Sequence, residues 1–167
     1  MPTIKLYNYS FTSIKTYLFA GLFVAGNIIL PQLAHMLPNG GPMFLPIYFF
    51  TLIAAYKYGM KTGLLTAILS PVINSLLFGM PVLAMLPIIL IKSSLLATAA
   101  AFAAKHFQKI SIVILLMVVL SYQIIGTLVE WAMVQNFWLA VQDFRIGLPG
   151  MAIQVLGAYA ILKLMKS

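Results

Sequence analysis

The sequence predicts an all-α integral membrane protein, a single bundle of six transmembrane helices over residues 1–167 with both termini in the cytoplasm. Three observations lead to this prediction. Hydrophobic residues make up 63% of the chain and charged residues only 7%, whereas a water-soluble domain is nearer half apolar and a quarter charged. The mean hydropathy is +1.06. The few charges lie between apolar blocks of roughly membrane-spanning length.

The apolar blocks between charges and turn residues give six candidate spans, since about 20 apolar residues cross the roughly 30 Å hydrocarbon core. The second and third are short, so we expect them to tilt or to be completed by lysines that reach the interface. Turn residues such as Pro38-Asn39-Gly40-Gly41-Pro42 and Gly79-Met80-Pro81 separate the blocks. The predicted spans are 16–36, 43–56, 62–78, 84–104, 110–134 and 146–164.

The basic residues fix the expected orientation. With a cytoplasmic N-terminus, eight of the ten basic residues fall on the inner side, as the positive-inside rule requires. The outer loops then hold only Arg145, with Asp143 nearby, and Lys92 lies within a span. This alternation requires an even number of spans. The inner residues are Lys5, Lys15, Lys57, Lys61, Lys105, Lys109, Lys163 and Lys166.

Prolines concentrate in the outer half of the predicted bundle. Membrane helices tolerate proline where neighbouring helices or a wet cavity satisfy the freed carbonyls. The pattern therefore favours helices that splay around an outward-facing cavity. The alternative is that prolines simply lie near helix ends, where they cost least. The residues concerned are Pro31, Pro46, Pro71, Pro87 and Pro149.

Lys92 and Glu130 stand out among the polar residues within the spans. Lys92 lies about 12 Å inside its predicted helix, and a charge at such depth should face the protein interior and have a partner. Glu130 is the only acid within a span, and it shares a helix face with Gln123 and Thr127. Two interpretations are open. The two charges form a structural ion pair, or they line a pocket for a polar or anionic solute, and the two roles are compatible. The predicted solute-binding residues are Asn27, His35, Asn74, Lys92, Gln123, Glu130, Trp131 and Gln154.

Two of these residues have a simpler interpretation as interfacial side chains. His35 lies near the outer end of the first span, where a histidine is more often interfacial than a ligand. Trp131 and Trp138, with Phe137 between them, lie where an aromatic belt is expected, and they could equally form a lid over the pocket.

Small residues form possible helix-packing faces. Gly21 and Ala25, in "YLFAGLFVAGNIIL" (17–30), are four residues apart, and such spacing lets another membrane helix approach closely. A second set of small residues occurs on the inner half of the fourth span. Each face has two possible roles: it docks another membrane subunit, or it packs against other helices within the bundle. The second set comprises Ala97, Ala100, Ala101 and Ala104.

Catalytic and nucleic-acid functions find little support. The chain has no cysteine and only two acids, and it has no metalloprotease, nucleophile-elbow or phosphate-loop motif. His35 and His106 fall on opposite sides of the predicted membrane, so we expect no metal site and no cofactor. The +8 net charge comes from scattered lysines rather than a patch, which indicates cationic loops and not nucleic-acid binding.

Residues 41–105 resemble the substrate-binding (S) components of energy-coupling factor (ECF) transporters, in the vitamin-uptake branch. The resemblance lies in the proline-rich entry, the Tyr58-Gly59 turn and "GLLTAILSPVINSLLFGMP" (63–81), followed by a proline-bearing fourth span. It implies capture of a vitamin or related micronutrient at the outer face of a prokaryotic cell membrane. A coupling membrane subunit and two ATPase subunits would then drive uptake.

The resemblance also implies roles for particular residues. Gly21 and Ala25 match the coupling motif of the first span, with glycine in place of the first alanine. The loop 36–44 and the outer parts of the last three spans would bind the substrate. Many relatives carry an acid where this chain has Lys92, which favours a substrate with an anionic group. A six-span scaffold of the bacterial cell-shape and wall-synthesis machinery is the alternative function, and a lipid-processing enzyme ranks third.

Overall fold

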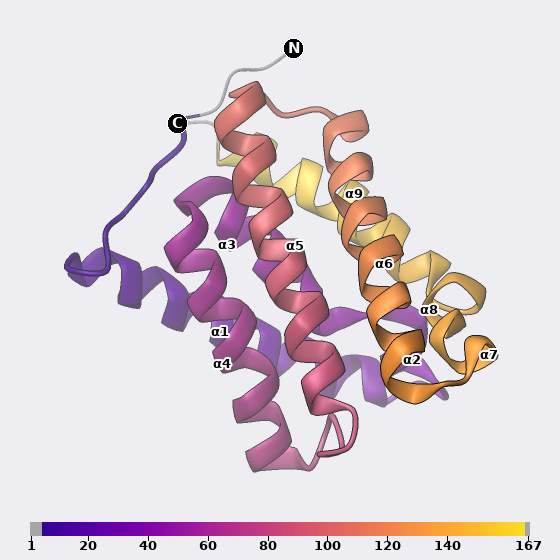
Figure 1. The fold of residues 1–167 in the computed structure, drawn as a ribbon. Coiled ribbons are helices and arrows are strands. Elements are labelled where there is room, and N and C mark those ends of the chain that lie inside the picture. Colours follow the sequence, from indigo (N-terminus) through magenta and orange to yellow (C-terminus); the bar gives the residue numbers. More distant parts are fainter. Residues whose placement is uncertain (1–4, 166–167) are drawn as a thin grey trace.

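The protein, described here by a computed structural model, consists of helices and their connections over residues 5–165, the part of the chain that the structure describes (Figure 1). Four helices are long and apolar enough to cross a membrane, so the chain is an all-α, multi-pass membrane protein. In chain order the elements are α1 (Ile14–His35), α2 (Gly40–Phe44), the 3-10 turn η1 (Pro46–Tyr48), α3 (Phe49–Tyr58), α4 (Met60–Phe78), α5 (Leu86–Phe107), α6 (Ile112–Val134), α7 (Phe137–Ala140), α8 (Gln142–Arg145) and α9 (Leu148–Leu164).

The four long helices, α1, α4, α5 and α6, coincide with predicted spans, and α9, with 17 residues, coincides with the last. The segment 43–56, expected to form one span, is not a single helix. Leu45 has a left-handed backbone conformation (φ 48°) that interrupts it, and η1 and the ten-residue α3 follow. A ten-residue helix is only about 15 Å long. An apolar run of 14 residues therefore forms two short elements rather than one tilted helix.

Helix α3 lies at the centre of the bundle and is buried at every position except the half-buried Phe50. It is apolar on all sides, as expected for a helix that contacts others all around. Gly63 allows α4 to approach α3 closely, because a Cβ added at Gly63 would lie 2.4 Å from the Cβ of Ala55 in α3. The turn into α4 requires Gly59, whose φ of +90° disfavours other residues.

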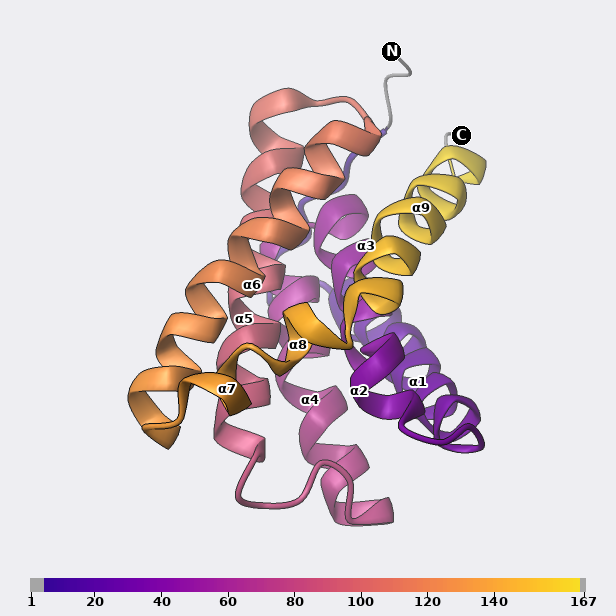
Figure 2. The same ribbon diagram turned by 90° about the vertical axis from the view of Figure 1, so that its right-hand side faces the viewer.

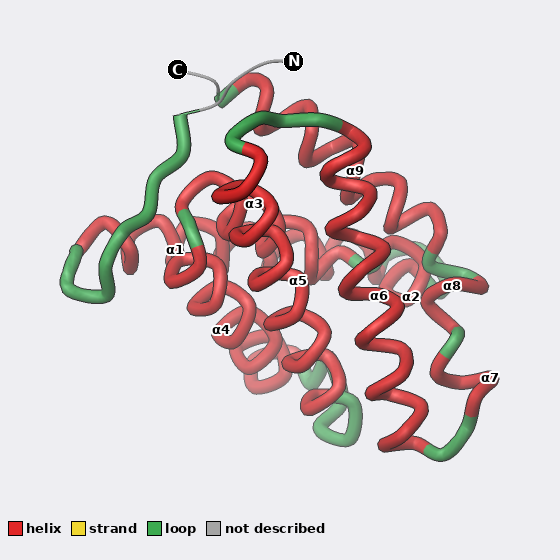
Figure 3. The backbone as a smooth tube through the Cα atoms, turned by 45° about the horizontal axis from the view of Figure 1, so that its top comes forward, coloured by secondary structure: helices red, strands yellow, loops and turns green. Residues whose placement is uncertain are grey.

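The remaining helices surround α3. Helices α4, α5 and α6 run side by side, α1 packs against α4 and α3, and α9 packs against α6 and α3 (Figures 1 and 2). Short connections join α4 to α5 and α5 to α6 (Figure 3). The short helices α2, α7 and α8 gather between α6, α9 and α1 towards one end of the bundle (Figure 2).

Lysines gather at the opposite end, which we call the lysine end. Lys57 closes α3 and donates a hydrogen bond to the carbonyl of Met165 at 2.5 Å. Its own carbonyl accepts one from the backbone N–H of Tyr7 at 2.9 Å. The hydroxyl of Tyr56 donates to the carbonyl of Lys109 at 2.7 Å. These bonds join the N-terminal segment, the end of α3, the α5–α6 connection and the end of α9.

Candidate functional site

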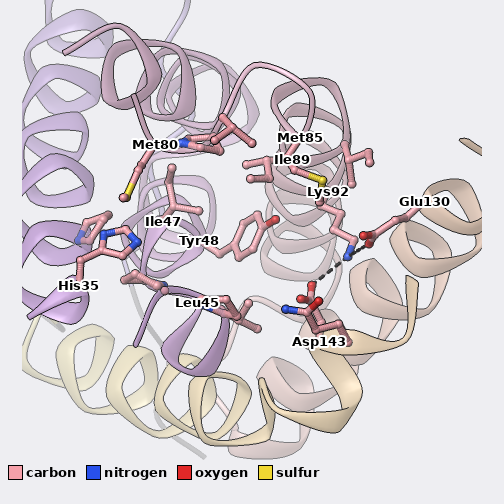
Figure 4. A pocket seen from close by; sticks show the side chains of 18 of the residues that line it. His35, Leu45, Ile47, Tyr48, Met80, Met85, Ile89, Lys92, Glu130 and Asp143 are labelled. Carbon is pink, nitrogen blue, oxygen red and sulfur yellow. Dashed lines mark hydrogen bonds and ion pairs between the residues drawn. The ribbon is translucent and has the colours of Figure 1, made fainter. Parts of the chain in front are cut away.

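A cavity of about 510 Å³ opens at the end of the bundle away from the lysine end. It lies between the end of α1, the break before α3, the 79–85 connection, the start of α5 and the short helices α7 and α8 (Figure 4). Most of its lining is apolar and rich in proline and methionine. The lining residues are Pro31, His35, Gly41, Pro42, Leu45, Pro46, Ile47, Tyr48, Met80, Pro81, Val82, Met85, Ile88, Ile89, Lys92, Glu130, Leu139, Gln142 and Asp143.

Three charged side chains meet at one side of this cavity. The Nζ of Lys92 lies 2.5 Å from Oε2 of Glu130 and 2.8 Å from Oδ2 of Asp143. Their side chains are 3%, 6% and 17% exposed, respectively. The Lys92–Glu130 ion pair, one of the two interpretations that the sequence left open, is thus present, and the ammonium also contacts a second carboxylate, that of Asp143. We call these three residues the charged triad.

Close packing of α5 on α6 holds the lysine in place. The aliphatic stem of Lys92 crosses Gly126, where an added Cβ would lie 2.6 Å from its Cγ. Gly126 is one helical turn from Glu130, on the same side of α6. The glycine therefore makes room for the stem, and the ammonium reaches the carboxylates beyond it.

Sequence reasoning placed Asp143 in an outer loop and gave it no role. It lies on α8, a four-residue helix that the chain forms after turning back from the end of α6. Both acidic residues of the chain thus converge on one lysine. Such scarcity is the one sequence signal that could have identified Asp143, because an acid in so apolar a chain is costly unless it is paired.

Tyr48 also faces the cavity and is only 3% exposed. Its ring packs against that of Tyr122, with centroids 5.4 Å apart. Within residues 5–165 its hydroxyl forms no hydrogen bond, and Figure 4 shows the hydroxyl turned towards Lys92. Tyr48 belongs to η1, so the break in the expected second span is what places this side chain in the cavity.

His35 lines the cavity on the side away from the charged triad (Figure 4). It ends α1 and contacts α2, because its Nε2 would lie 2.7 Å from a Cβ added at Gly41. His35, Lys92 and Glu130 are therefore the predicted binding residues that the structure brings around this cavity.

Asn27 and Asn74 instead belong to a buried hydrogen-bond network. The amide of Asn27 donates to the hydroxyls of Thr51 at 3.0 Å and Ser70 at 3.1 Å, and its Oδ1 accepts from the backbone N–H of Phe50 at 3.1 Å. Asn74 donates to the carbonyl of Asn27 at 2.9 Å. This network joins α1, α3 and α4 and satisfies an N–H in the first turn of α3, which its own helix leaves without a partner.

Gln123 of α6 and Gln154 of α9 are fully buried and do not line the cavity. Gln154 accepts a hydrogen bond from the hydroxyl of Tyr122 at 3.0 Å. Its Nε2 and both polar atoms of Gln123 have no partner in the described part of the chain, and the same holds for the hydroxyls of Ser93 and Thr127. These residues therefore belong to the interior of the bundle and not to the wall of the cavity.

Trp131 lies outside the cavity and is 46% exposed, with its ring edge-on to Phe137. Trp138 is 68% exposed and stacks under the guanidinium of Arg145 at 5.6 Å. These exposed rings at the cavity end are placed as an aromatic belt would be. The sequence left a belt and a lid as alternatives, and the arrangement favours the belt.

The two small-residue faces have different environments. Gly21 and Ala25 are exposed, and a Cβ at Gly21 would meet nothing within 4 Å. Gly26, next to them, packs inward against Phe50. The alanines of α5, in contrast, are buried within the bundle and contribute to its core: Ala97, Ala100, Ala101 and Ala104.

A second cavity, of about 690 Å³, lies at the lysine end beside Tyr7, Tyr56 and Lys105. No acidic side chain lines it. Among residues 5–165 no three histidine or acidic side chains gather as metal ligands. The charged triad is therefore the strongest candidate for a site.

Comparisons of the chain with protein-family models, with curated proteins and with solved structures found no match.

Proposed function

We propose that the chain is the substrate-capturing membrane subunit of an ECF-type transporter, and that it binds a vitamin or related micronutrient at the outer face of a prokaryotic cell membrane. The observation that carries the proposal is the cavity beside the charged triad. Its volume of about 510 Å³ lies within the roughly 300–1,000 Å³ of small-molecule sites, which are mostly apolar with a few placed polar groups.

The proposal requires a particular topology. In it α1, α4, α5 and α6 cross the membrane, the segment from α2 to α3 and the 17-residue α9 act as two short spans, and both termini are cytoplasmic. The lysine end then faces the cytoplasm, in keeping with the positive-inside rule. The cavity faces outwards, where a solute can enter it.

The absence of cysteine from the chain offers a direct test of this topology. Single cysteines replacing Val82, in the α4–α5 connection, or Asn136, before α7, should react with a membrane-impermeant maleimide in intact cells. Cysteines replacing Lys61 or Lys109, at the lysine end, should react only after the membrane is permeabilised. The reverse pattern, or equal labelling of both sets, would contradict the proposed orientation.

Delivery of the solute would need partners, because the sequence offers no phosphate-binding loop. The exposed face around Gly21 and Ala25 is the proposed docking surface for a coupling membrane subunit that two ATPase subunits drive. Small residues on an exposed transmembrane face allow close packing of another helix. ATP hydrolysis by the purified chain alone would contradict this division of labour.

Solute binding itself is tested by mass spectrometry of small molecules released from the purified, detergent-solubilised protein. We expect one compound to be enriched over a mock purification. A cell-shape scaffold has no need of a cavity with buried charges, so retention of a solute separates the two functions.

A further inference from the structure

The charges around the cavity do not balance. Counted by formal charge, the carboxylates of Glu130 and Asp143 contribute two negative charges, and the ammonium of Lys92 contributes one positive charge. Lys92 is the only lysine or arginine among the residues that line the cavity. Arg145 lies two residues from Asp143 but is exposed and stacks on Trp138. With His35, the other basic group on this wall, counted as neutral, the cavity wall therefore has a formal charge of −1.

Each carboxylate also keeps one oxygen free. Lys92 contacts Oε2 of Glu130 and Oδ2 of Asp143, and in the described part of the chain neither Oε1 nor Oδ1 has a hydrogen-bond partner. Neither oxygen is among the fully enclosed atoms that lack a partner, so each keeps some contact with solvent, and both residues line the cavity. A carboxylate oxygen that is open to a mostly apolar cavity favours a donor that brings positive charge.

Tyr48 supplies an independent polar contact. It is 3% exposed, lines the same cavity and has a hydroxyl without a partner among residues 5–165 (Figure 4). A tyrosine ring attracts a cation to its face, and its hydroxyl can accept an N–H donor. A buried side chain of this kind, lining the same cavity as the two carboxylates, completes a pocket for a positively charged group.

We propose that the cavity binds a solute whose polar end is an organic cation, held by Oε1 of Glu130, Oδ1 of Asp143 and Tyr48. This inference rests on the proposed solute-binding function and names its substrate class. The apolar remainder of the cavity, lined by Ile47, Met85 and Ile89, takes the body of the molecule. Lys92 fixes the two carboxylates in position. The sequence, through Lys92 alone, led us to expect an anionic solute; the proposed site favours a cationic one.

Three probes of similar shape and different charge test the proposal at pH 7: benzylamine as its ammonium ion, benzyl alcohol and benzoate. Their binding is measured by ligand-observed NMR on the full chain in detergent micelles, with empty micelles as the blank. We expect the ammonium ion to bind roughly tenfold or more tightly than the alcohol, and benzoate to bind most weakly.

Variants of residues in the cavity test whether the preference for the ammonium ion arises there. Asp143→Asn should remove most of the advantage of the ammonium ion, because the amide keeps the shape and loses the charge. Tyr48→Phe should weaken its binding by a smaller factor. Arg145→Gln, an exposed change on the same short helix, serves as the control and should leave the preference intact. Thermal unfolding of each variant shows that it is folded.

Four outcomes would overturn the proposal. They are preferential binding of benzoate, equal binding of the three probes, an ammonium preference that survives in Asp143→Asn, and no detectable binding of any probe. The proposed solute-binding function is judged separately, by the molecule released from the purified protein. An anionic or neutral released compound would refute the cation site and leave that function standing.

Discussion

Replacing Lys92 with methionine tests the charged triad most severely. Methionine fills much of the same space above Gly126 but removes the one cation that contacts Glu130 and Asp143. At an effective dielectric constant of about 20, the 2.5 and 2.8 Å separations correspond to roughly 7 and 6 kcal/mol of attraction before desolvation is subtracted. Breaking a buried pair by removing one partner typically costs about 3–5 kcal/mol.

We therefore expect Lys92→Met to lower the free energy of unfolding by about 3–5 kcal/mol. Adding Glu130→Leu should restore most of this loss, because Asp143, with a side chain that is 17% exposed, can turn towards water in the cavity. Unfolding of the single and double variants is measured by denaturant titration in one detergent, as a double-mutant cycle. Lys105→Met is the matched control, an exposed lysine on the same helix.

A Lys92→Met variant as stable as Lys105→Met would refute this reasoning. So would a double variant that is less stable than the single one. In either case the two carboxylates would not depend on the lysine, and the packing of α8 against α6 would need another explanation.

Three further predictions concern packing. Gly126→Val should displace the Lys92 stem, so that stability and probe binding fall together, which unfolding and NMR titrations of the same sample detect. Asn27→Leu should cost about 1–3 kcal/mol, because it leaves a backbone N–H of α3 unsatisfied, yet it should leave the ammonium preference unchanged. Gly21→Leu should abolish uptake in cells while unfolding stays as in the wild type, whereas Gly26→Leu, which must clash with a ring of α3, should unfold the protein. Normal uptake by Gly21→Leu would exclude this face as a docking surface.

The sequence predicted the long helices well because their apolar blocks are bounded by charges and turn residues. It also paired Lys92 with Glu130, since a deeply placed charge needs a partner and the spans contain only one acid. It could not place Asp143. That residue reaches the triad through the connection formed by α7 and α8, whose path depends on tertiary packing rather than on any periodic pattern.

Other differences have equally local causes. A uniformly apolar run such as 43–56 indicates burial but not where the backbone breaks, and the break at Leu45 is what brings Tyr48 into the cavity. The spacing of small residues likewise does not show whether a helix face is buried in the bundle or exposed. The face at Gly21 is exposed and that at Ala97 is buried, although both patterns favour close helix packing. Which face is free depends on the neighbours that each helix acquires.

Native mass spectrometry of the intact protein released from detergent tests the central claim most directly, the claim that the cavity beside the triad holds a solute. We expect a population of wild-type protein that carries one additional small mass. This mass should be retained by Gly21→Leu, which alters the far face of α1, and lost from Asp143→Asn. A wild-type protein that never carries such a mass when purified from its native membrane would contradict this claim. A mass that Asp143→Asn retains undiminished would contradict the cation site within it.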